Sequence, residues 1–190
     1  GKNALDKLTV RTRKLEAVAS FASSGFVLSS HSKKGLPISV VNVSAVDVNF
    51  FRVNLQCISA FFQSNINSGK VNDYWLKRLA GYAELIHTSR FEINPTANQR
   101  TLTNINISHI ARLQQQGLYV AVMKQAGDYT SQSSVIFFSV SDIGLHLRRY
   151  EDHFSVFVND IADGKAIGGV QLALYNPAGE RLTETETNGE

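Results

Sequence analysis

A period-two alternation of apolar and polar side chains runs through Ile38-Ser-Val-Val-Asn-Val-Ser-Ala-Val-Asp-Val-Asn-Phe-Phe-Arg-Val-Asn54. Successive side chains of a β-strand point to opposite faces, so this period predicts strand structure with one buried and one wet face. Val41, Val43 and Ala45 share one face, and the alternation slips by one residue after Ala45 before it continues to Phe50. The slip indicates either a β-bulge or two strands joined at a bend.

Strand-like segments recur along the chain, separated by clusters of Gly, Asn, Asp and Ser. They are residues 21–28, 89–93, 101–107, 117–124 and 134–140. Short strands at this spacing predict an all-β fold, an antiparallel β-sandwich of two sheets like those of immunoglobulin and fibronectin type III domains. Residues 55–65 and 74–84 instead have helical spacing. We expect them to form one or two short helical crossovers, or a helical insertion between strands.

A second alternating series begins near Tyr150 and includes residues 154–159, 170–175 and 181–189. We therefore expect a leading linker or strand at 1–14, a first sandwich at 15–145 and the start of a second at 146–190. The junction is predicted at residues 142–152, where Gly144 interrupts the preceding strand and a polar, charged run follows. Two or three strands cannot bury a core alone, so we expect the second domain to be truncated and its parent chain to continue past Glu190.

Composition indicates a globular protein and excludes several classes. The chain has 190 residues, of which 43% are hydrophobic and 18% charged. The formal charge is +3, and the basic residues are scattered, with the densest groups at 7–14 and 148–149. Nucleic-acid binders cluster such residues on one face, so we interpret both groups as solvated strand faces. No apolar stretch approaches the roughly 20 residues of a membrane span and no signal peptide is present, so any targeting segment would lie upstream of Gly1.

The single cysteine, Cys57, lies in an apolar run and cannot form an internal disulfide. A nucleophilic thiol needs a nearby histidine and an electropositive, partly exposed setting. Nothing adjacent supplies these, so a buried, inert side chain is the preferred interpretation. Trp75 lies on the apolar side of a predicted helix, which favours a place in the core over an aromatic binding platform.

The remaining polar motifs favour structural roles. The five histidines lack the close pairing of a zinc motif and are expected at exposed loop or strand positions: His31, His87, His109, His146 and His153. Asp160 and Asp163 flank a glycine loop without the further carboxylates of a calcium site, which predicts an Asx-type turn. Two glycosylation-like triplets, at 42–44 and 106–108, lie in predicted strands. No catalytic residue, metal ligand or cofactor site is expected, and the chain is not expected to be an enzyme.

The order of segments resembles a known family. One series runs through Phe26-Val27-Leu28, Leu36-Pro37-Ile38, Val41-Asn42-Val43, Val46-Asp47-Val48 and Phe51-Arg52-Val53. Later segments continue it: Gly117-Leu-Tyr-Val-Ala-Val122, Phe137-Phe-Ser-Val-Ser-Asp-Ile-Gly-Leu145, Asp160-Ile-Ala-Asp-Gly-Lys-Ala-Ile-Gly-Gly-Val-Gln-Leu-Ala-Leu-Tyr-Asn176 and Thr187-Asn-Gly189. Together they resemble the amino-terminal macroglobulin domains of bacterial alpha-2-macroglobulins over most of residues 15–190.

The resemblance implies a parent protein and a role. Members of this family are large periplasmic proteins, often anchored to the inner membrane by lipid, that trap proteases after a bait segment is cut. In many members a thioester in a Cys-x-Glu-Gln arrangement then acylates the protease. Cys57 is followed by Ile58, Ser59 and Ala60, so it does not match that arrangement. The resemblance thus implies a structural segment of a broad-spectrum protease inhibitor. Its expected partners are neighbouring macroglobulin domains and, through the full-length parent, target proteases, but no nucleic acid.

One alternative from a different class stays open. An extracytoplasmic immunoglobulin-like module, such as an adhesin, would have the same sandwich and would bind a ligand through its loops.

Overall fold

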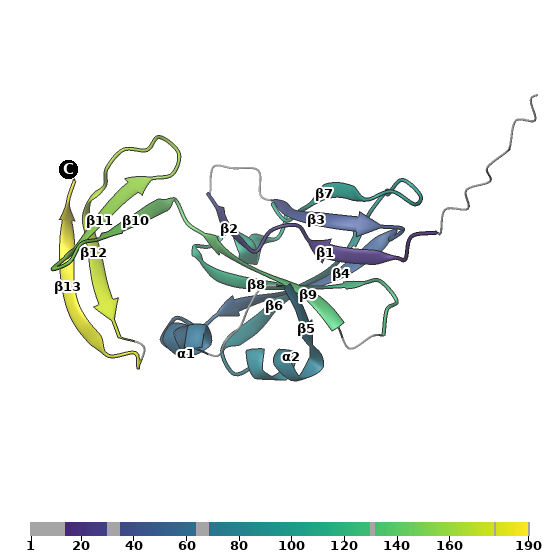
Figure 1. Cartoon of the computed structure of the whole chain (residues 1–190), viewed down its shortest axis with the longest axis horizontal. Helices are drawn as coiled ribbons and strands as arrows, with labels where there is room; N and C mark the ends of the chain where they lie inside the picture. The colour runs from purple at the N-terminus through teal and green to yellow at the C-terminus, as the bar shows by residue number, and fades with distance from the viewer. Residues whose placement is uncertain (1–13, 30–34, 64–68, 130–131, 177, 190) are drawn as a thin grey trace, which may run out of the picture.

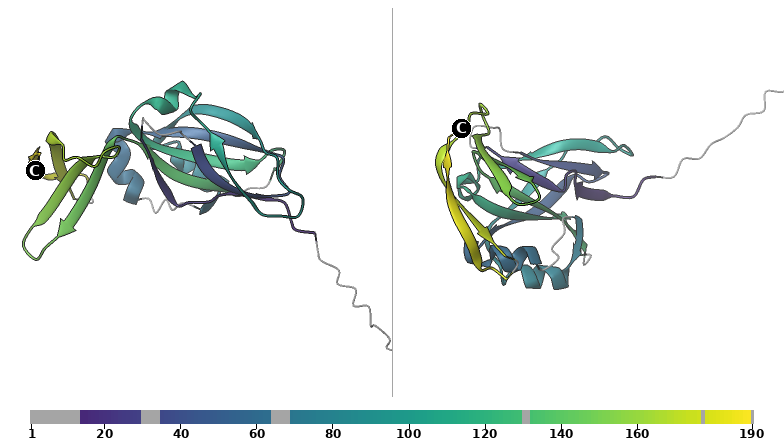
Figure 2. Two further views of the ribbon diagram at one scale, coloured as in Figure 1. Left: turned by 90° about the horizontal axis from the view of Figure 1, so that it is seen from above. Right: turned by 60° about the vertical axis from the view of Figure 1, so that its left-hand side comes forward.

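The computed structural model describes residues 14–29, 35–63, 69–129, 132–176 and 178–189. These residues form a two-layered β-sandwich followed by a pair of β-hairpins. Figure 1 shows the sandwich and, at one end of it, the hairpins, and the left view of Figure 2 places the hairpins at that same end. In the described ranges, no helix has the length and apolar character needed to cross a membrane.

Most of the sandwich is built from nine strands. They are β1 (Val18–Phe21), β2 (Gly25–Leu28), β3 (Gly35–Val41), β4 (Ala45–Val53), β5 (Gly69–Asn72), β6 (Ala83–Glu92), β7 (Thr101–Asn106), β8 (Gly117–Gln125) and β9 (Gln132–Val140). Short helices interrupt them: the 3-10 helices η1 (Leu55–Cys57) and η2 (Ala111–Gln114), and the α-helices α1 (Ile58–Gln63) and α2 (Asp73–Leu79). The all-β prediction is confirmed.

The strands form two sheets. The smaller sheet has the order β1-β3-β7, and the larger has the order β2-β9-β8-β4-β6, with β5 also paired to β9. The pairs are antiparallel except β2 and β9, which run parallel, with Gly25 opposite Phe137 and Leu28 opposite Val140. This parallel pair was not expected from the sequence, because it joins a strand near the start of the first domain to a strand near its end.

The stretch 38–54 proves to be two strands joined at a bend, the second of the two structures predicted for it. The chain leaves the small sheet at Val41 and enters the large sheet at Ala45. Asn42 adopts a left-handed conformation with φ of 53° at the bend, which asparagine tolerates better than most residues. The phase slip after Ala45 therefore marks a change of sheet.

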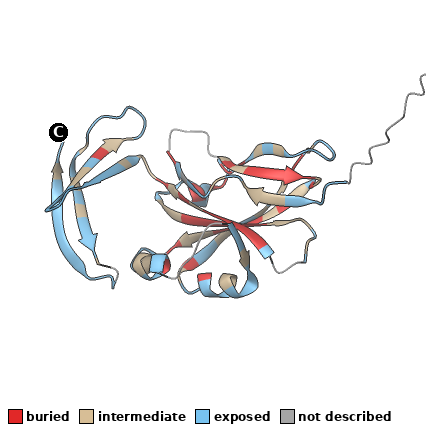
Figure 3. Ribbon diagram, in the orientation of Figure 1, coloured by how far each residue is buried: buried red, intermediate tan, exposed pale blue. Residues whose placement is uncertain are grey.

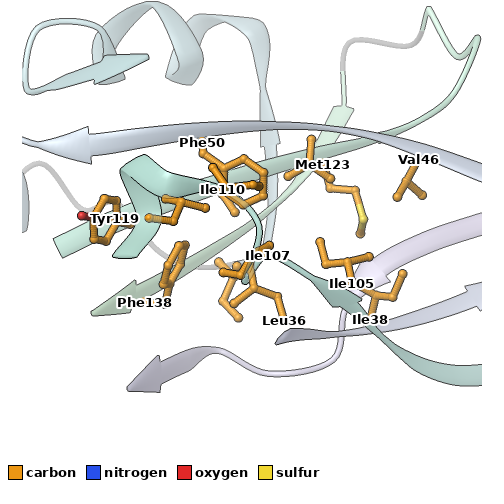
Figure 4. Close-up of a cluster of buried hydrophobic side chains, with 14 of the residues drawn as sticks. Leu36, Ile38, Val46, Phe50, Ile105, Ile107, Ile110, Tyr119, Met123 and Phe138 are labelled. Carbon is orange, nitrogen blue, oxygen red and sulfur yellow. The ribbon is translucent and has the colours of Figure 1, made fainter. Parts of the chain in front are cut away.

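The main core lies between the two sheets. Its side chains come from β3, β4, β7, β8 and β9 and from the segment that follows β7, and Figure 4 shows them meeting in one cluster. Those with no more than 2% exposure include Leu36, Ile38, Val46, Phe50, Ile105, Ile107, Tyr119, Met123 and Phe138. The ring of Tyr119 stacks on that of Phe138 with centroids 5.3 Å apart. Tyr119 also donates a hydrogen bond of 2.7 Å to the carbonyl of Gln115.

A second core lies on the outer face of the large sheet. Here α1 and α2 cover part of the face that points away from the main core, and Phe61 and Leu79 are buried against Val53, Val120 and Val122. Asn72 starts α2, because its side-chain oxygen accepts a hydrogen bond of 3.0 Å from the Trp75 amide. The expected helical insertion is thus present. Its predicted end at residue 84 is wrong, since the chain turns after Leu79 and β6 begins at Ala83.

The hairpins follow directly. Strands β10 (Ile143–Arg149) and β11 (Phe154–Asp160) form the first, and β12 (Gly168–Tyr175) and β13 (Arg181–Asn188) form the second. The prediction of a polar run without a strand between Gly144 and residue 153 is wrong, because β10 occupies most of it. The expected border between residues 145 and 146 falls inside β10. β10 carries a period-two alternation at Ile143, Leu145 and Leu147, which the polar interpretation of this run overlooked.

Burial differs sharply between the two parts. Figure 3 shows buried residues throughout the sandwich and few in the hairpins. Among the described residues after Asp142, Val158 alone is buried, at 4% exposure. The hairpins therefore have no core of their own comparable with that of the sandwich.

Candidate functional region: the joint after β9

The sandwich and the hairpins meet at Ser141 and Asp142, between β9 and β10. The Ser29 hydroxyl, at the end of β2, donates a hydrogen bond of 2.9 Å to Oδ1 of Asp142. The Ser141 amide donates one of 3.0 Å to the carbonyl of Leu28. On the other side, the Ile161 amide donates one of 2.9 Å to the carbonyl of Asp142. Asp142 is therefore bonded to the sandwich through its side chain and to the hairpins through its backbone.

The hairpins approach the sandwich at a second place, where the turn that joins β12 to β13 lies opposite α1. A groove of about 730 Å³ separates them, with Leu55 and Phe62 on one wall and Tyr175 on the other. None of the described residues that line it is charged, and these three side chains are more than half exposed. Gly179, with φ of 85°, approaches Ser59 across the groove. The joint and this groove together position the hairpins beside the sandwich.

The histidines are spread over separate elements. Among the described residues, His87 lies on β6 near Phe50, His109 near Phe91, and His146 on β10 near Phe157. His153 stacks on Tyr150 with ring centroids 4.5 Å apart. His31 lies outside the described residues. Across the ranges that the structure describes, no three His, Cys, Asp or Glu side chains come together in a way that could hold a metal ion.

The glycine loop after β11 forms the expected Asx-type turns. The Ala162 amide donates to Oδ1 of Asp160 at 2.7 Å, and the Lys165 amide donates to Oδ1 of Asp163 at 3.0 Å. The Lys165 ammonium lies 2.7 Å from Oδ2 of Asp163, and its hydrogen bond, followed by that of the Lys165 amide, holds the pKa of Asp163 below its ordinary value. Both carboxylates therefore support the turn geometry.

Cys57 is half-buried in η1 instead of fully buried as predicted, because η1 covers only the margin of the second core. Trp75 packs against the second core from α2, as expected. Its indole Nε1 is buried and has no hydrogen-bond partner in the described part of the chain. Neither residue is an exposed platform for a ligand.

The two glycosylation-like triplets prove to be hydrogen-bonded turns. Asn42 accepts a hydrogen bond of 2.7 Å from the Asn98 amide and donates one of 2.7 Å to the carbonyl of Leu15. Asn106 accepts one of 2.9 Å from the Ser108 amide. Each asparagine therefore stabilises a strand end through its side-chain amide.

Of the two groups of basic residues, the structure describes the pair at 148–149 in full. Residues 7–13 are outside the described part of the chain. The guanidinium of Arg148 lies 5.4 Å from the centroid of the Phe157 ring on the exposed face of the first hairpin. Such a contact stabilises a hairpin face, which agrees with the solvated interpretation of this pair.

Sequence reasoning did not find Ser29 as part of the joint. The Ser29–Asp142 bond spans 113 residues, and no local pattern marks a serine that follows a short strand as a partner for a distant carboxylate. The parallel pairing of β2 with β9 brings the two side chains together.

Comparison with known proteins gives a consistent result. A family model described as the bacterial alpha-2-macroglobulin MG2 domain matches residues 20–138. A second, the bacterial alpha-2-macroglobulin MG3 domain, matches residues 140–190. The border between the two matches lies just before the joint.

Full-length relatives and solved structures agree with these models. Alpha-2-macroglobulin from Escherichia coli is 34% identical over 182 residues, covering 96% of this chain and 11% of that protein. The native E. coli structure spanning domains NIE-MG1 has a TM-score of 0.76 at 33% identity, over 92% of this chain and 84% of that one. The structure of trypsin-activated E. coli alpha-2-macroglobulin has a TM-score of 0.77 at 32% identity, over 90% of this chain and 12% of that one. This chain thus spans about a tenth of the length of the full-length relative.

Proposed function

The chain belongs to the bacterial alpha-2-macroglobulin family, and from this membership we propose that it is a structural segment of a periplasmic protein that traps proteases. In this role the segment carries no chemistry. It holds neighbouring macroglobulin domains at a defined angle and transmits movement between them when the larger protein changes shape.

The observation that carries the proposal is the tandem match to two consecutive domain models of one family, MG2 at 20–138 and MG3 at 140–190. A relative whose structure aligns with 90% of this chain was solved in a trypsin-activated form. Activation by a protease is the behaviour expected of a trap. The proposal extends that behaviour to the protein of which this sequence forms a part.

The geometry supports a rigid domain that is connected to its neighbour at one short segment. The sandwich is stabilised by two cores on opposite faces of its large sheet, so it resists bending as a unit. The connection to the hairpins includes the hydrogen bonds of Asp142, Ser29 and Ile161 and lies beside the groove next to α1. A rigid body whose connection lies outside its cores allows its neighbour to rotate without disturbing those cores.

The proposal is tested on the natural protein. Antibodies raised against this 190-residue chain would be used to locate it in fractionated source cells and to precipitate it. We expect a periplasmic protein several times longer than 190 residues, whose mobility on a native gel changes after addition of active trypsin. Trypsin with a blocked active site is the matched control and should leave the mobility unchanged. A cytoplasmic location, or a mobility that active trypsin does not alter, would contradict the proposal.

A further inference from the structure

One side of the sandwich is open between the outer edges of β6 and β7. Among the described residues, β6 pairs with β4 alone and β7 with β3 alone. A slot of about 600 Å³ lies between these edges. Both strands line it, β6 with Ser89, Arg90, Phe91 and Glu92 and β7 with Thr101, Thr103, Asn104, Ile105 and Asn106. Of these, Ser89, Phe91, Thr101, Thr103 and Ile105 are the less exposed side chains.

Backbone groups of β7 point into this opening. The Ala22 amide donates to the carbonyl of Pro37 at 2.9 Å, so the backbone groups of Pro37 face β1. The backbone N–H and C=O groups of successive strand residues point to opposite sides of the strand, so those of Leu36, Ile38 and Val40 in β3 face β7. Their partners in the register are Thr101, Thr103 and Ile105. The N–H and C=O groups of Leu102 and Asn104, between those partners, therefore face the open edge.

The two edges differ in how they are protected. β6 carries Glu84, Arg90 and Glu92, and charged side chains discourage the addition of another strand. β7, Thr101-Leu-Thr-Asn-Ile-Asn106, has no charge and no proline. Its Leu102 side chain is 73% exposed. Of the two edges, β7 is therefore the one to which an additional strand can pair.

We propose that the β7 edge binds an extended peptide segment of another polypeptide as an added strand of the small sheet. A residue of an extended strand between two packed sheets occupies about 160 Å³, given its rise of about 3.3 Å, a strand spacing of about 4.8 Å and a sheet spacing of about 10 Å. The slot therefore has room for about four residues.

The lining of the slot sets the preferred peptide. Side chains that point inward would lie over Phe91, Ile105 and the methyl groups of Thr101 and Thr103, which favours valine, isoleucine or threonine at alternate positions. Main-chain hydrogen bonds to Leu102 and Asn104 would supply affinity. This binding site is independent of the protease-trapping proposal, since it requires only the sandwich.

The test uses the whole chain labelled with nitrogen-15 and an acetylated, amidated heptapeptide of alternating threonine and valine with a lysine at each end. At a free peptide concentration of ten times Kd, we expect amide exchange of Leu102 and Asn104 to slow about tenfold. The amides of Thr101 and Thr103, already bonded to β3, should change little. Unchanged exchange at Leu102 and Asn104 in the presence of millimolar peptide would overturn the proposal.

Two controls separate edge pairing from other effects. Thr103→Lys places a charge inside the slot and should abolish binding, whereas Leu102→Lys adds the same charge on the opposite face and should preserve it. A heptapeptide methylated on the backbone nitrogens of its pairing edge should not bind the unmodified chain, which keeps the test valid if Thr103→Lys does not fold. Equal binding of the methylated peptide would overturn the proposal. So would a concentration-dependent dimer without peptide in which Leu102 and Asn104 are already protected, since the edge would then pair with a second copy of the chain.

Discussion

The Ser29 hydroxyl bonds to the Asp142 carboxylate at 2.9 Å and so ties the end of β2 to the connection between the sandwich and the hairpins. Together with the Ser141–Leu28 backbone bond, it fixes the last residues of β9 against the sandwich before the chain leaves it. The direction in which β10 departs therefore depends on this pair.

Replacing Asp142 tests that relationship. Asp142→Ala removes a charged acceptor, and hydrogen bonds to charged groups are worth about 1.5–3 kcal/mol. We expect the free energy of unfolding to fall by about 1–2 kcal/mol, because Asp142 is only half-buried, and the amides near Ser141 to exchange faster. Asp152→Ala is the control, since that side chain is 86% exposed. Equal behaviour of the two variants in exchange and urea unfolding would contradict the assignment of the joint.

Limited proteolysis tests the predicted domain bounds. A resistant core should end near residues 145–152, and residues 153–190 should be lost first. The reason is that the described hairpins bury only Val158, too little to offset roughly 1–2 kcal/mol of backbone ordering per residue. Mass spectrometry of the fragments identifies the cut sites. Survival of the carboxy-terminal part while residues 15–145 are degraded would show that the bounds are wrong.

Two neighbouring phenylalanines test the second core. Phe61 is 1% exposed and Phe62 is 63% exposed. Phe61→Ala should lower the free energy of unfolding by about 3–5 kcal/mol, the usual cost of emptying a buried aromatic site. Phe62→Ala should cost less than about 1 kcal/mol, a difference that urea unfolding monitored by circular dichroism resolves. Similar losses in both variants would mean that α1 does not pack as described.

Tyr119 gives a prediction with a pH dependence. Tyr119→Phe removes the hydrogen bond to Gln115 and should cost about 1 kcal/mol. Burial raises the pKa of Tyr119 above its ordinary value, so the folded state holds this proton more tightly than the unfolded state. The corresponding stability is fully present below about pH 10 and is lost as the pH rises through the folded-state pKa. The phenylalanine variant should therefore lose less stability in this alkaline range.

Thermal unfolding from pH 8 to 12 measures the effect. Tyr129→Phe is the matched control, because that side chain is 98% exposed, and it should follow the parent chain at every pH. If Tyr119→Phe loses as much stability at alkaline pH as the parent chain, groups other than Tyr119 cause that loss.

The chain alone should be inert toward a protease. After incubation with trypsin we expect no hydrolysis of a protease substrate by the chain and no covalent chain–trypsin adduct, because Cys57 lacks the Cys-x-Glu-Gln arrangement. Intact-mass spectrometry checks this, with Cys57→Ser as the control. A mass increase of one whole trypsin, absent in the serine variant, would show that Cys57 is reactive.

The sequence by itself located β3, β4, β7, β8 and β9 and the interior that they share, but it did not find β5 and did not separate β1 from β2. Alternation in residues 38–54 predicted which side chains of β4 are buried, and the helical spacing around Trp75 predicted a helix packed by its apolar side. Both follow from local periodicity, because a side chain's direction depends on the backbone of its own element. The order of the segments also identified the family, since it records the order of strands along the fold.

Only the tertiary structure decided which strands pair and where the two parts are joined. The parallel pairing of β2 with β9, the Ser29–Asp142 bond and the open edge of β7 each depend on residues far apart in the sequence. β10 was missed for a different reason: its sequence alternates at Ile143, Leu145 and Leu147, but Gly144 and the charged run from His146 were interpreted as the end of strand structure. Local sequence specifies the faces of a strand, whereas its edges are specified by its neighbours, and both the joint and the proposed binding site lie at edges.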